Sequence, residues 1–326
     1  MPKVACAALN TDVGPHLEIF KSKGFDVVLP PAGKDLFQED NLIAVLKDCD
    51  AVVAGSEPYT RRVISSLPKL RVIARRGVGF DAVDLQAADD HNVAVATTPG
   101  VLDESVAEHT VAMLLACARG FPALDRQVRE GRWGRVAYPR VSGKTLGIIG
   151  LGRIGQAVVP KAIGLGLKVI AYDPFPNAEF AKKWNVEYTT LEDLWGRCEF
   201  ISLHLAMSPE TLNLINKQTI AKMKRGVVIV NTGRGQLIDE DDLCAALKSG
   251  QVASAGLDVF QKEPLPTSSP LIQLENVLLS GHVAGLDLES NHDIAVRFAE
   301  NIVTLHEGGW PTESIRNLKG KTDWKW

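Results

Sequence analysis

The sequence predicts an α/β protein built from two doubly wound, mostly parallel sheets. Three observations predict this class. Short apolar runs alternate with helical patterns from one end of the chain to the other. The alternation pauses after about residue 100 and restarts at Thr145, which indicates two separate α/β units. The length of 326 residues also favours two domains, at roughly 100–200 residues per domain.

The first unit is predicted from short runs rich in Val, Ile and Ala, each followed by a helical pattern. Its expected strands are residues 4–9, 25–30, 50–55 and 70–75. Its expected helices are residues 13–24, 41–49 and 60–68. Residues 93–100 then bring the chain to a turn, and two helices follow at 105–120 and 121–133. This order predicts a parallel sheet, because parallel strands need crossover helices between them.

The second unit repeats the alternation. Its expected strands are residues 145–150, 168–173, 200–205, 227–233, 252–260 and 276–282. Its expected helices are residues 152–166, 177–184, 190–198, 216–226 and 239–250, and a long helix at 289–309 closes the chain. Pro160 lies inside the helix at 152–166, where it should kink the helix or remove one backbone hydrogen bond.

The composition argues against several classes of partner. The formal net charge is −3 and there is no long Lys/Arg run, so neither nucleic acid nor a membrane surface is expected. The apolar run at the N-terminus is too short for a signal peptide, and residues 111–118 are too few to span a membrane. The five cysteines lack C-x-x-C spacing, which favours free thiols and a cytoplasmic location. The sequence contains no Cys/His cluster with metal-ligand spacing, so no metal site is expected.

A glycine-rich turn opens the second unit. Gly150, Gly152 and Gly155 have G-x-G-x-x-G spacing between a strand and a helix, as a dinucleotide's pyrophosphate requires. Asp173 follows Gly155 at close to the expected spacing of about 20 residues. Its carboxylate would accept hydrogen bonds from the ribose hydroxyls of NAD and would repel the 2′-phosphate of NADP. The sequence therefore predicts NAD as the cofactor, with a simple glycine-rich turn as the alternative.

Three polar residues follow three successive strands of the second unit: Arg234, Glu263 and His282. In open α/β sheets, ligands bind beyond the carboxyl ends of the strands. A guanidinium can hold a substrate carboxylate through two hydrogen bonds, and an imidazole oriented by a carboxylate can exchange a proton near neutral pH. The trio predicts hydride transfer between NAD and a 2-hydroxy acid.

Each member of the trio also has a simpler interpretation. Arg234 could be a cation on a solvated turn, Glu263 a surface acid before a proline, and His282 a core residue with satisfied hydrogen bonds. The other histidines carry less signal. His109 and His204 could lie near the site without taking part in chemistry, and the remainder are expected on helix surfaces or loops: His16, His91, His292 and His306.

Beyond these local patterns, the chain resembles the D-isomer specific 2-hydroxyacid dehydrogenases, a family that includes phosphoglycerate dehydrogenases and glyoxylate/hydroxypyruvate reductases. The resemblance covers nearly the whole chain. It rests on RRGVGFDAVD (75–84), SVAEHT (105–110), GRW (131–133), GKTLGIIGLGRIG (143–155), YDP (172–174), SLHLAMSPET (202–211), VVIVNTGRGQLID (227–239), AGLDVFQKEPLP (255–266) and LLSGHVAG (278–285).

The resemblance implies a Rossmann NAD-binding domain at 101–285, inserted into a flavodoxin-like substrate domain at 1–100 and 286–326, and a homodimer. It implies Arg234, Glu263 and His282 as the catalytic set. It implies backbone contacts to the substrate carboxylate from Val78 and Gly79. The implied cofactor contacts are Arg153, Ile154, Asp173, Thr232, Asp258 and Thr110.

Departures from the family pattern leave the substrate open. Ala206 stands where the family often has Pro. The turn after the third strand has Gly55 and Ser56 where phosphoglycerate dehydrogenases often carry an Arg-Ser pair, although Arg75 and Arg76 could meet a phosphate. The expected activity is therefore that of an NAD-dependent dehydrogenase of a small D-2-hydroxy acid or 2-oxo acid. A dehydrogenase of a phosphorylated hydroxy acid and a non-catalytic NAD(H)-sensing co-regulator are the alternatives.

Overall fold

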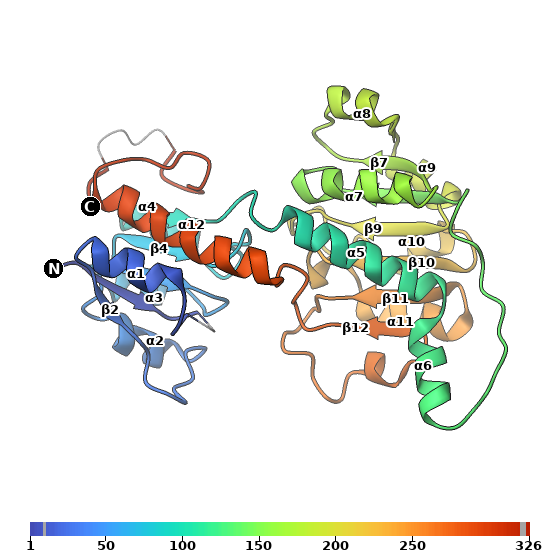
Figure 1. Ribbon diagram of the computed structural model, residues 1–326, viewed down its shortest axis with the longest axis horizontal. Coiled ribbons are helices and arrows are strands. Elements are labelled where there is room, and N and C mark those ends of the chain that lie inside the picture. Colours follow the sequence, from blue (N-terminus) through green and yellow to red (C-terminus); the bar gives the residue numbers. More distant parts are fainter. Residues whose placement is uncertain (9–10, 320–323) are drawn as a thin grey trace. The chain divides into compact units, whose positions relative to one another are not determined.

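The computed structural model describes residues 1–8, 11–319 and 324–326 (Figure 1). The chain folds into two compact units. Unit 1 comprises Met1–Leu102 and Asp287–Trp326, and unit 2 comprises Asp103–Leu286. Each unit has its own sheet, and every strand pairing in both sheets is parallel. The predicted fold class is confirmed.

Unit 1 has a five-stranded sheet in the order β2-β1-β3-β4-β5. Its strands are β1 (Lys3–Cys6), β2 (Asp26–Val28), β3 (Ala51–Ala54), β4 (Val72–Arg75) and β5 (Ala94–Ala96). Its helices are α1 (Pro15–Ser22), α2 (Glu39–Leu46), α3 (Arg61–Ser65), α4 (Leu85–Asp90) and α12 (Leu288–His306). Helices α1 and α12 pack against each other (Figure 1), while α2, α3 and α4 supply side chains to one buried cluster with the strands.

Unit 2 has a seven-stranded sheet in the order β12-β11-β10-β9-β6-β7-β8. Its strands are β6 (Thr145–Ile149), β7 (Lys168–Tyr172), β8 (Glu187–Tyr188), β9 (Phe200–Leu203), β10 (Val227–Asn231), β11 (Val252–Leu257) and β12 (Val277–Leu279). Its helices are α5 (Asp103–Ala118), α6 (Phe121–Arg129), α7 (Arg153–Gly164), α8 (Ala178–Trp184), α9 (Leu191–Arg197), α10 (Lys217–Lys222) and α11 (Glu240–Ser249).

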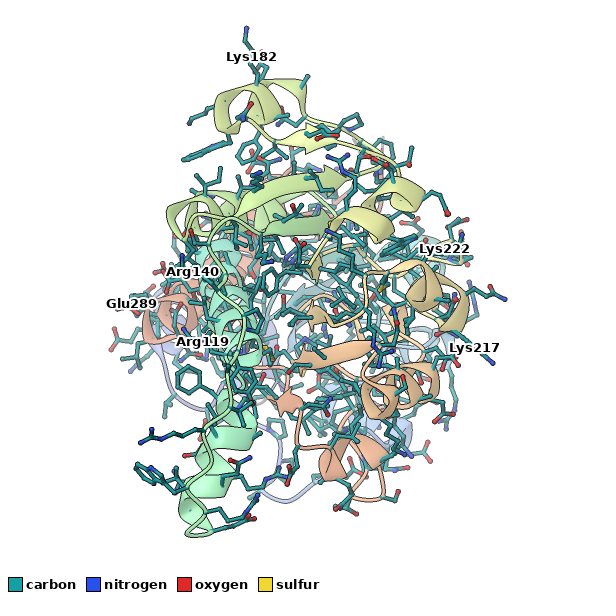
Figure 2. The ribbon with its side chains drawn as sticks, turned by 90° about the vertical axis from the view of Figure 1, so that its right-hand side faces the viewer. Arg119, Arg140, Lys182, Lys217, Lys222 and Glu289 are labelled. Atoms are coloured by element: carbon teal, nitrogen blue, oxygen red, sulfur yellow. The ribbon has the colours of Figure 1, made fainter. Side chains whose placement is uncertain are left out.

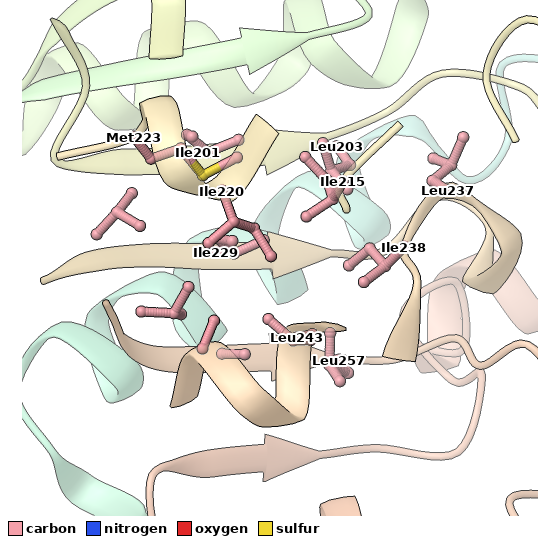
Figure 3. Packing of buried hydrophobic residues seen from close by; sticks show 14 of the residues in the cluster. Ile201, Leu203, Ile215, Ile220, Met223, Ile229, Leu237, Ile238, Leu243 and Leu257 are labelled. Carbon is pink, nitrogen blue, oxygen red and sulfur yellow. The ribbon is translucent and has the colours of Figure 1, made fainter. Parts of the chain in front are cut away.

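The central strands of unit 2 are buried on both faces, as parallel sheets require. One face packs against α5 and α7, and the other against α9, α10 and α11. Figure 3 shows the second cluster, in which Ile229 of β10 lies among Ile201, Ile220 and Leu243. The lysines labelled on α8 and α10 point away from the ribbon (Figure 2). In the described parts of the chain, no helix combines the length and apolar character needed to cross a membrane.

Three short elements were not predicted from the sequence: β5, β8 and α4. The two strands have only three and two residues, too few for a period-2 pattern to be recognised. Helix α4 did carry a signal, because Asp84 caps it by accepting a hydrogen bond from the Ala87 N–H. The first strand is shorter than expected, and residue 9 of the predicted range lies outside the described residues. Pro160 does lie inside α7.

The expected surface position of His16 is wrong. Its side chain is 1% exposed, because α12 covers this face of α1 and the His16 ring packs edge-on against Phe298 at 5.1 Å between ring centroids. The helical pattern of α1 could not show this, since the covering helix lies more than 270 residues further along the chain.

Candidate active site

The glycine turn between β6 and α7 has the geometry that a dinucleotide needs. Gly150 has φ 97°, and a Cβ there would lie 2.7 Å from the carbonyl carbon of His204. A Cβ on Gly155 would lie 2.2 Å from the carbonyl oxygen of Gly150. Around Gly152, in contrast, no described residue other than its chain neighbours comes within 4 Å of the Cβ position, and no side chain caps α7. The N-terminus of α7, including the backbone of Arg153 and Ile154, is therefore open to a phosphate group.

Asp173 lies beside this turn, directly after β7. Its Oδ2 accepts a hydrogen bond from the Leu151 N–H at 2.7 Å, and its Oδ1 accepts one from the Phe175 N–H at 2.7 Å. A carboxylate has about four lone-pair sites, so acceptor capacity remains for ribose hydroxyls. Nearby, Arg153 donates to Asp103 at 2.8 Å, which holds its side chain against the start of α5.

Glu263 and His282 are in direct contact. Nδ1 of His282 lies 2.7 Å from Oε2 of Glu263, and Oε1 of Glu263 accepts a hydrogen bond from the Phe260 N–H at 2.9 Å. An ionised carboxylate only accepts hydrogen bonds, so Nδ1 carries the proton and Nε2 is the atom that can exchange one. His282 has φ 56°, an uncommon conformation for a residue other than glycine and one often associated with function.

The electrostatics of this pair favour a charged imidazole. The hydrogen bond to Glu263 raises the pKa of His282 above its usual value. Burial and the nearby charge of Arg234 act in the opposite direction but are outweighed. Burial opposes ionisation of Glu263, but hydrogen bonds from His282 and the Phe260 N–H outweigh it and lower the pKa of that carboxyl. The pair therefore stabilises the proton that reduction of a carbonyl consumes.

Arg234 follows β10 in the loop that Asn231 organises. The fully buried Asn231 side chain accepts from the Gly233 N–H at 3.0 Å and donates to the Arg234 carbonyl at 2.8 Å. The guanidinium donates to the Gly233 carbonyl at 2.7 Å. Strands β10, β11 and β12 are parallel neighbours, so the three predicted catalytic residues, which follow these strands, lie at one edge of the sheet of unit 2.

Asp258 fixes the segment that carries His282. Its side chain is fully buried at the end of β11. One carboxylate oxygen accepts from the Ser280 hydroxyl at 2.5 Å and the Val283 N–H at 2.9 Å, and the other accepts from the Ala284 N–H at 2.9 Å. The backbone carbonyl of Asp258 accepts from the His282 N–H at 2.7 Å. Asp258 is thus a positioning residue in this structure, and the predicted cofactor contact stays a prediction.

Two other pairs of predicted site residues are Thr110 with Thr232 in unit 2 and Val78 with Gly79 in unit 1. Thr110 and Thr232 are hydrogen-bonded to each other at 2.8 Å, and Thr110 is fully buried. In unit 1, Arg75 donates to the carbonyl of Gly79 at 2.9 Å and so holds the turn after β4. Among the residues that the structure describes, the N–H groups of Val78 and Gly79 donate to no protein acceptor, which suits them to bind a carboxylate.

Sequence reasoning missed the supporting residues Asn231 and Ser280. Asn231 directly precedes the loop of Arg234, and an Asn at a strand end, whose side chain can bond the backbone two residues on, is a turn signal that could have identified it. Ser280 links Asp258 to His109, whose Nε2 lies 3.0 Å from the Ser280 hydroxyl. Nothing in the local sequence indicates that contact, since it joins two elements 171 positions apart.

Comparison with known proteins decides the family. Residues 111–284 match the model of the D-isomer specific 2-hydroxyacid dehydrogenase, NAD binding domain. The chain belongs to this family. The fold, the cofactor and the reaction class predicted from the sequence are thereby confirmed: the protein is an NAD-dependent oxidoreductase of D-2-hydroxy acids.

Individual relatives cover most of the chain. A glyoxylate reductase of Korarchaeum cryptofilum is 40% identical over 88% of this chain and 86% of its own. A D-3-phosphoglycerate dehydrogenase of Mycobacterium bovis is 41% identical over 85% of this chain but only 53% of its own, so the chain spans about half the length of that relative. The crystal structure of TT0316 protein from Thermus thermophilus superposes with a TM-score of 0.88 at 31% identity, over 97% of this chain and 99% of that one.

A structure with ligands is also similar. D-lactate dehydrogenase from Aquifex aeolicus, complexed with NAD and lactic acid, has a TM-score of 0.84 at 27% identity, over 96% of this chain and 98% of that one. The residues of unit 2 fit NAD by their own geometry, because the turn at Gly152 is open, α7 lacks a side-chain cap and Asp173 lies alongside.

Proposed function

We propose that Arg234, Glu263 and His282 carry the reaction, with His282 as the proton donor in reduction and the proton acceptor in oxidation. The observation that carries this assignment is the 2.7 Å contact between Nδ1 of His282 and Glu263, which leaves Nε2 for the substrate oxygen. NAD supplies the hydride chemistry when bound. General acid–base catalysis by a positioned imidazole contributes about 10²–10⁴-fold to such a step.

Arg234 binds the substrate carboxylate and stabilises negative charge on the reacting oxygen. The family resemblance supports the proposal that the N–H groups of Val78 and Gly79 also bind the substrate carboxylate. Glu263 holds the imidazole in one tautomer. Thr110, Thr232, Asp258, Arg153 and Ile154 are proposed to bind the cofactor with the glycine turn, either directly or by supporting the residues that touch it.

The proposed substrate is a small D-2-hydroxy acid or the corresponding 2-oxo acid. The similarity to glyoxylate reductase and D-lactate dehydrogenase supports this size class. Similarity to phosphoglycerate dehydrogenases is equally close in sequence, but it covers about half of their length and does not favour a phosphorylated substrate over the main proposal. The preference for NAD over NADP rests on Asp173 and its repulsion of a 2′-phosphate.

We also propose a homodimer in the cytoplasm. Residues 121–136, which include α6, expose large apolar side chains of the kind that mark an interface. These side chains are Phe121, Val128, Trp133 and Val136. Unpartnered apolar side chains of this kind on one segment support association with a second copy, and sedimentation analysis of Trp133→Ser tests it. All five cysteines are free and buried, which supports a reducing compartment.

Steady-state kinetics of His282→Ala tests the catalytic assignment. With NADH and glyoxylate, hydroxypyruvate or pyruvate, we expect kcat to fall by about 10²–10⁴-fold while the Kd for NADH changes little. Near-normal turnover in this variant would refute the role of His282. A wild-type protein that binds NADH tightly but reduces none of the 2-oxo acids would instead be an NAD(H) sensor.

A further inference from the structure

Unit 1 contains a cavity of about 130 Å³ at the N-terminal ends of α1 and α12. A single water needs only about 10–15 Å³ of such space, so the cavity has room for a polyatomic group. His16, Arg76 and Asn291 line it, with apolar walls that include Phe298. None of these residues belongs to the glycine turn or to the catalytic set.

His16 presents one ring nitrogen without a partner. Its Nε2 lies 2.9 Å from the carbonyl oxygen of Thr11, an atom that only accepts, so Nε2 carries the proton. Nδ1 is buried and has no hydrogen-bond partner among the described residues. The ring is fixed by edge-on contacts with Phe20 and Phe298. A buried nitrogen without a partner is costly, which makes Nδ1 a group that a ligand would satisfy.

The space beside Nδ1 exists because residue 14 is a glycine. A Cβ at Gly14 would lie 2.9 Å from Nδ1 of His16 and would block it. Gly14 and His16 both line the cavity. The unpartnered nitrogen and the missing Cβ therefore coincide at one place.

Arg76 supplies a positive charge to the same cavity. Its guanidinium donates to the side-chain oxygen of Asn291, a neutral amide. Across the described ranges 1–8, 11–319 and 324–326, no carboxylate lies within salt-bridge distance of it. Burial lowers the pKa of Arg76, and burial together with the Arg76 charge lowers the pKa of His16. The cavity thus combines a half-buried cation with a neutral imidazole whose unpartnered Nδ1 can accept a hydrogen bond.

We propose that this cavity binds a phosphate group that keeps one P–OH hydrogen. Its anionic oxygens would accept hydrogen bonds from Arg76 and its hydroxyl would donate to Nδ1 of His16. Hydrogen phosphate meets both demands at neutral pH. A sulfate or a carboxylate offers only acceptors there, so it would leave Nδ1 unsatisfied. The proposal is independent of the dehydrogenase reaction.

Isothermal titration at pH 8 with potassium phosphate and potassium sulfate tests this ligand chemistry directly. Both anions are dianions at that pH, but only phosphate carries a hydrogen. We expect the full-length protein to bind phosphate at least tenfold more tightly than sulfate. Equal affinities, or no phosphate binding at all, would overturn the proposal.

Two variants locate the binding. Arg76→Gln should weaken phosphate binding at least tenfold, whereas Arg297→Gln should not change it. Arg297 is the matched control, because it removes one guanidinium from α12, where its partner is Glu300 at 3.9 Å. His16→Phe keeps the ring packing but removes both nitrogens, and it should abolish the preference for phosphate over sulfate. If His16→Phe does not fold, Arg76→Gln decides: unchanged phosphate affinity in that variant refutes the site.

The P–OH requirement selects inorganic phosphate over a phosphate monoester, whose second pKa of about 6 leaves it without a hydrogen at pH 8, and kinetics test this choice. For free phosphate, KM for phosphohydroxypyruvate and KM for hydroxypyruvate should both be unchanged in Arg76→Gln. A KM for phosphohydroxypyruvate that rises at least tenfold in this variant, with an unchanged KM for hydroxypyruvate, would show that the cavity takes a fully ionised monoester and would overturn the proposal. If the His282 assignment fails, the titration result still stands, because it does not depend on turnover.

Discussion

Replacing Glu263 by glutamine should harm catalysis more than replacing it by alanine. In the native pair, one carboxylate oxygen accepts the Phe260 N–H at 2.9 Å and the other accepts the proton on Nδ1 of His282 at 2.7 Å. In Glu263→Gln, the Phe260 N–H keeps the amide oxygen on its side. The amide NH₂ then faces Nδ1, which must become an acceptor, so the proton moves to Nε2.

The wrong tautomer disables both directions of the reaction. With its proton on Nε2, neutral His282 cannot accept the proton of a hydroxy acid, and the NH₂ group opposes a proton on Nδ1. We expect kcat to fall by about 10²–10⁴-fold, most of the contribution of general acid–base catalysis. In Glu263→Ala, water can hydrate Nδ1, and the loss is that of one charge-assisted hydrogen bond. Because His282 is 52% exposed, we take the low end, about 1.5 kcal/mol or roughly tenfold.

Steady-state kcat for glyoxylate reduction by both variants, with NADH affinity measured by fluorescence, checks this order. Glu275→Gln is the matched control, since it makes the same change at an exposed site in the same unit and should leave kcat unaffected. The pH dependence of the reduction rate provides a second test, because its direction is fixed by the pKa of His282. Glu263 raises the pKa of His282, so reduction by the wild type should fall as pH rises through that raised value, and in Glu263→Ala it should fall at lower pH. Glu263→Gln activity equal to or above that of Glu263→Ala would refute the tautomer argument.

Gly155→Ala should cost about 1–3 kcal/mol of unfolding free energy and most of the NADH affinity, because its Cβ would lie 2.2 Å from the Gly150 oxygen; a native melting temperature with native affinity would contradict this. Asp258→Asn should lower kcat and reduce the free energy of unfolding by about 1–3 kcal/mol, because an amide cannot accept hydrogen bonds from all three donors. Steady-state kinetics and calorimetry measure the two losses, and an unchanged kcat would exclude the positioning role. Asp173→Ser should raise KM for NAD and improve the relative use of NADP, as steady-state kinetics with both cofactors would reveal; an unaltered ratio would argue against Asp173 as the discriminator.

The sequence was sufficient wherever the governing rules are local. The glycine turn follows from residues that lie within six positions of one another, and the carboxyl ends of parallel strands necessarily meet at one edge. That is why Arg234, Glu263 and His282 could be grouped without coordinates. The same logic located Asp173 at the end of the neighbouring strand, where the structure places its carboxylate against the Leu151 N–H.

Long-range packing accounts for what could not be predicted. His16 has the pattern of a surface position until α12 returns to cover α1, and its free nitrogen exists only because of a glycine two residues before it. His109 of α5 contacts Ser280, which follows β12, although the two residues lie 171 positions apart in the sequence. Strands β5 and β8 are too short to show the alternating pattern of a strand. They are identified only by their pairing with neighbouring strands in the sheet.

The catalytic histidine depends on one strand end for its unusual backbone. A left-handed conformation at a residue such as His282 costs of order 1–3 kcal/mol and persists only where the surroundings impose it. Here Asp258 accepts the N–H groups of three successive residues, 282 through its backbone carbonyl and 283 and 284 through its carboxylate. The geometry that turns the imidazole toward Glu263 is therefore set by the end of β11. This explains why replacing Asp258, which need not touch the substrate, should lower kcat.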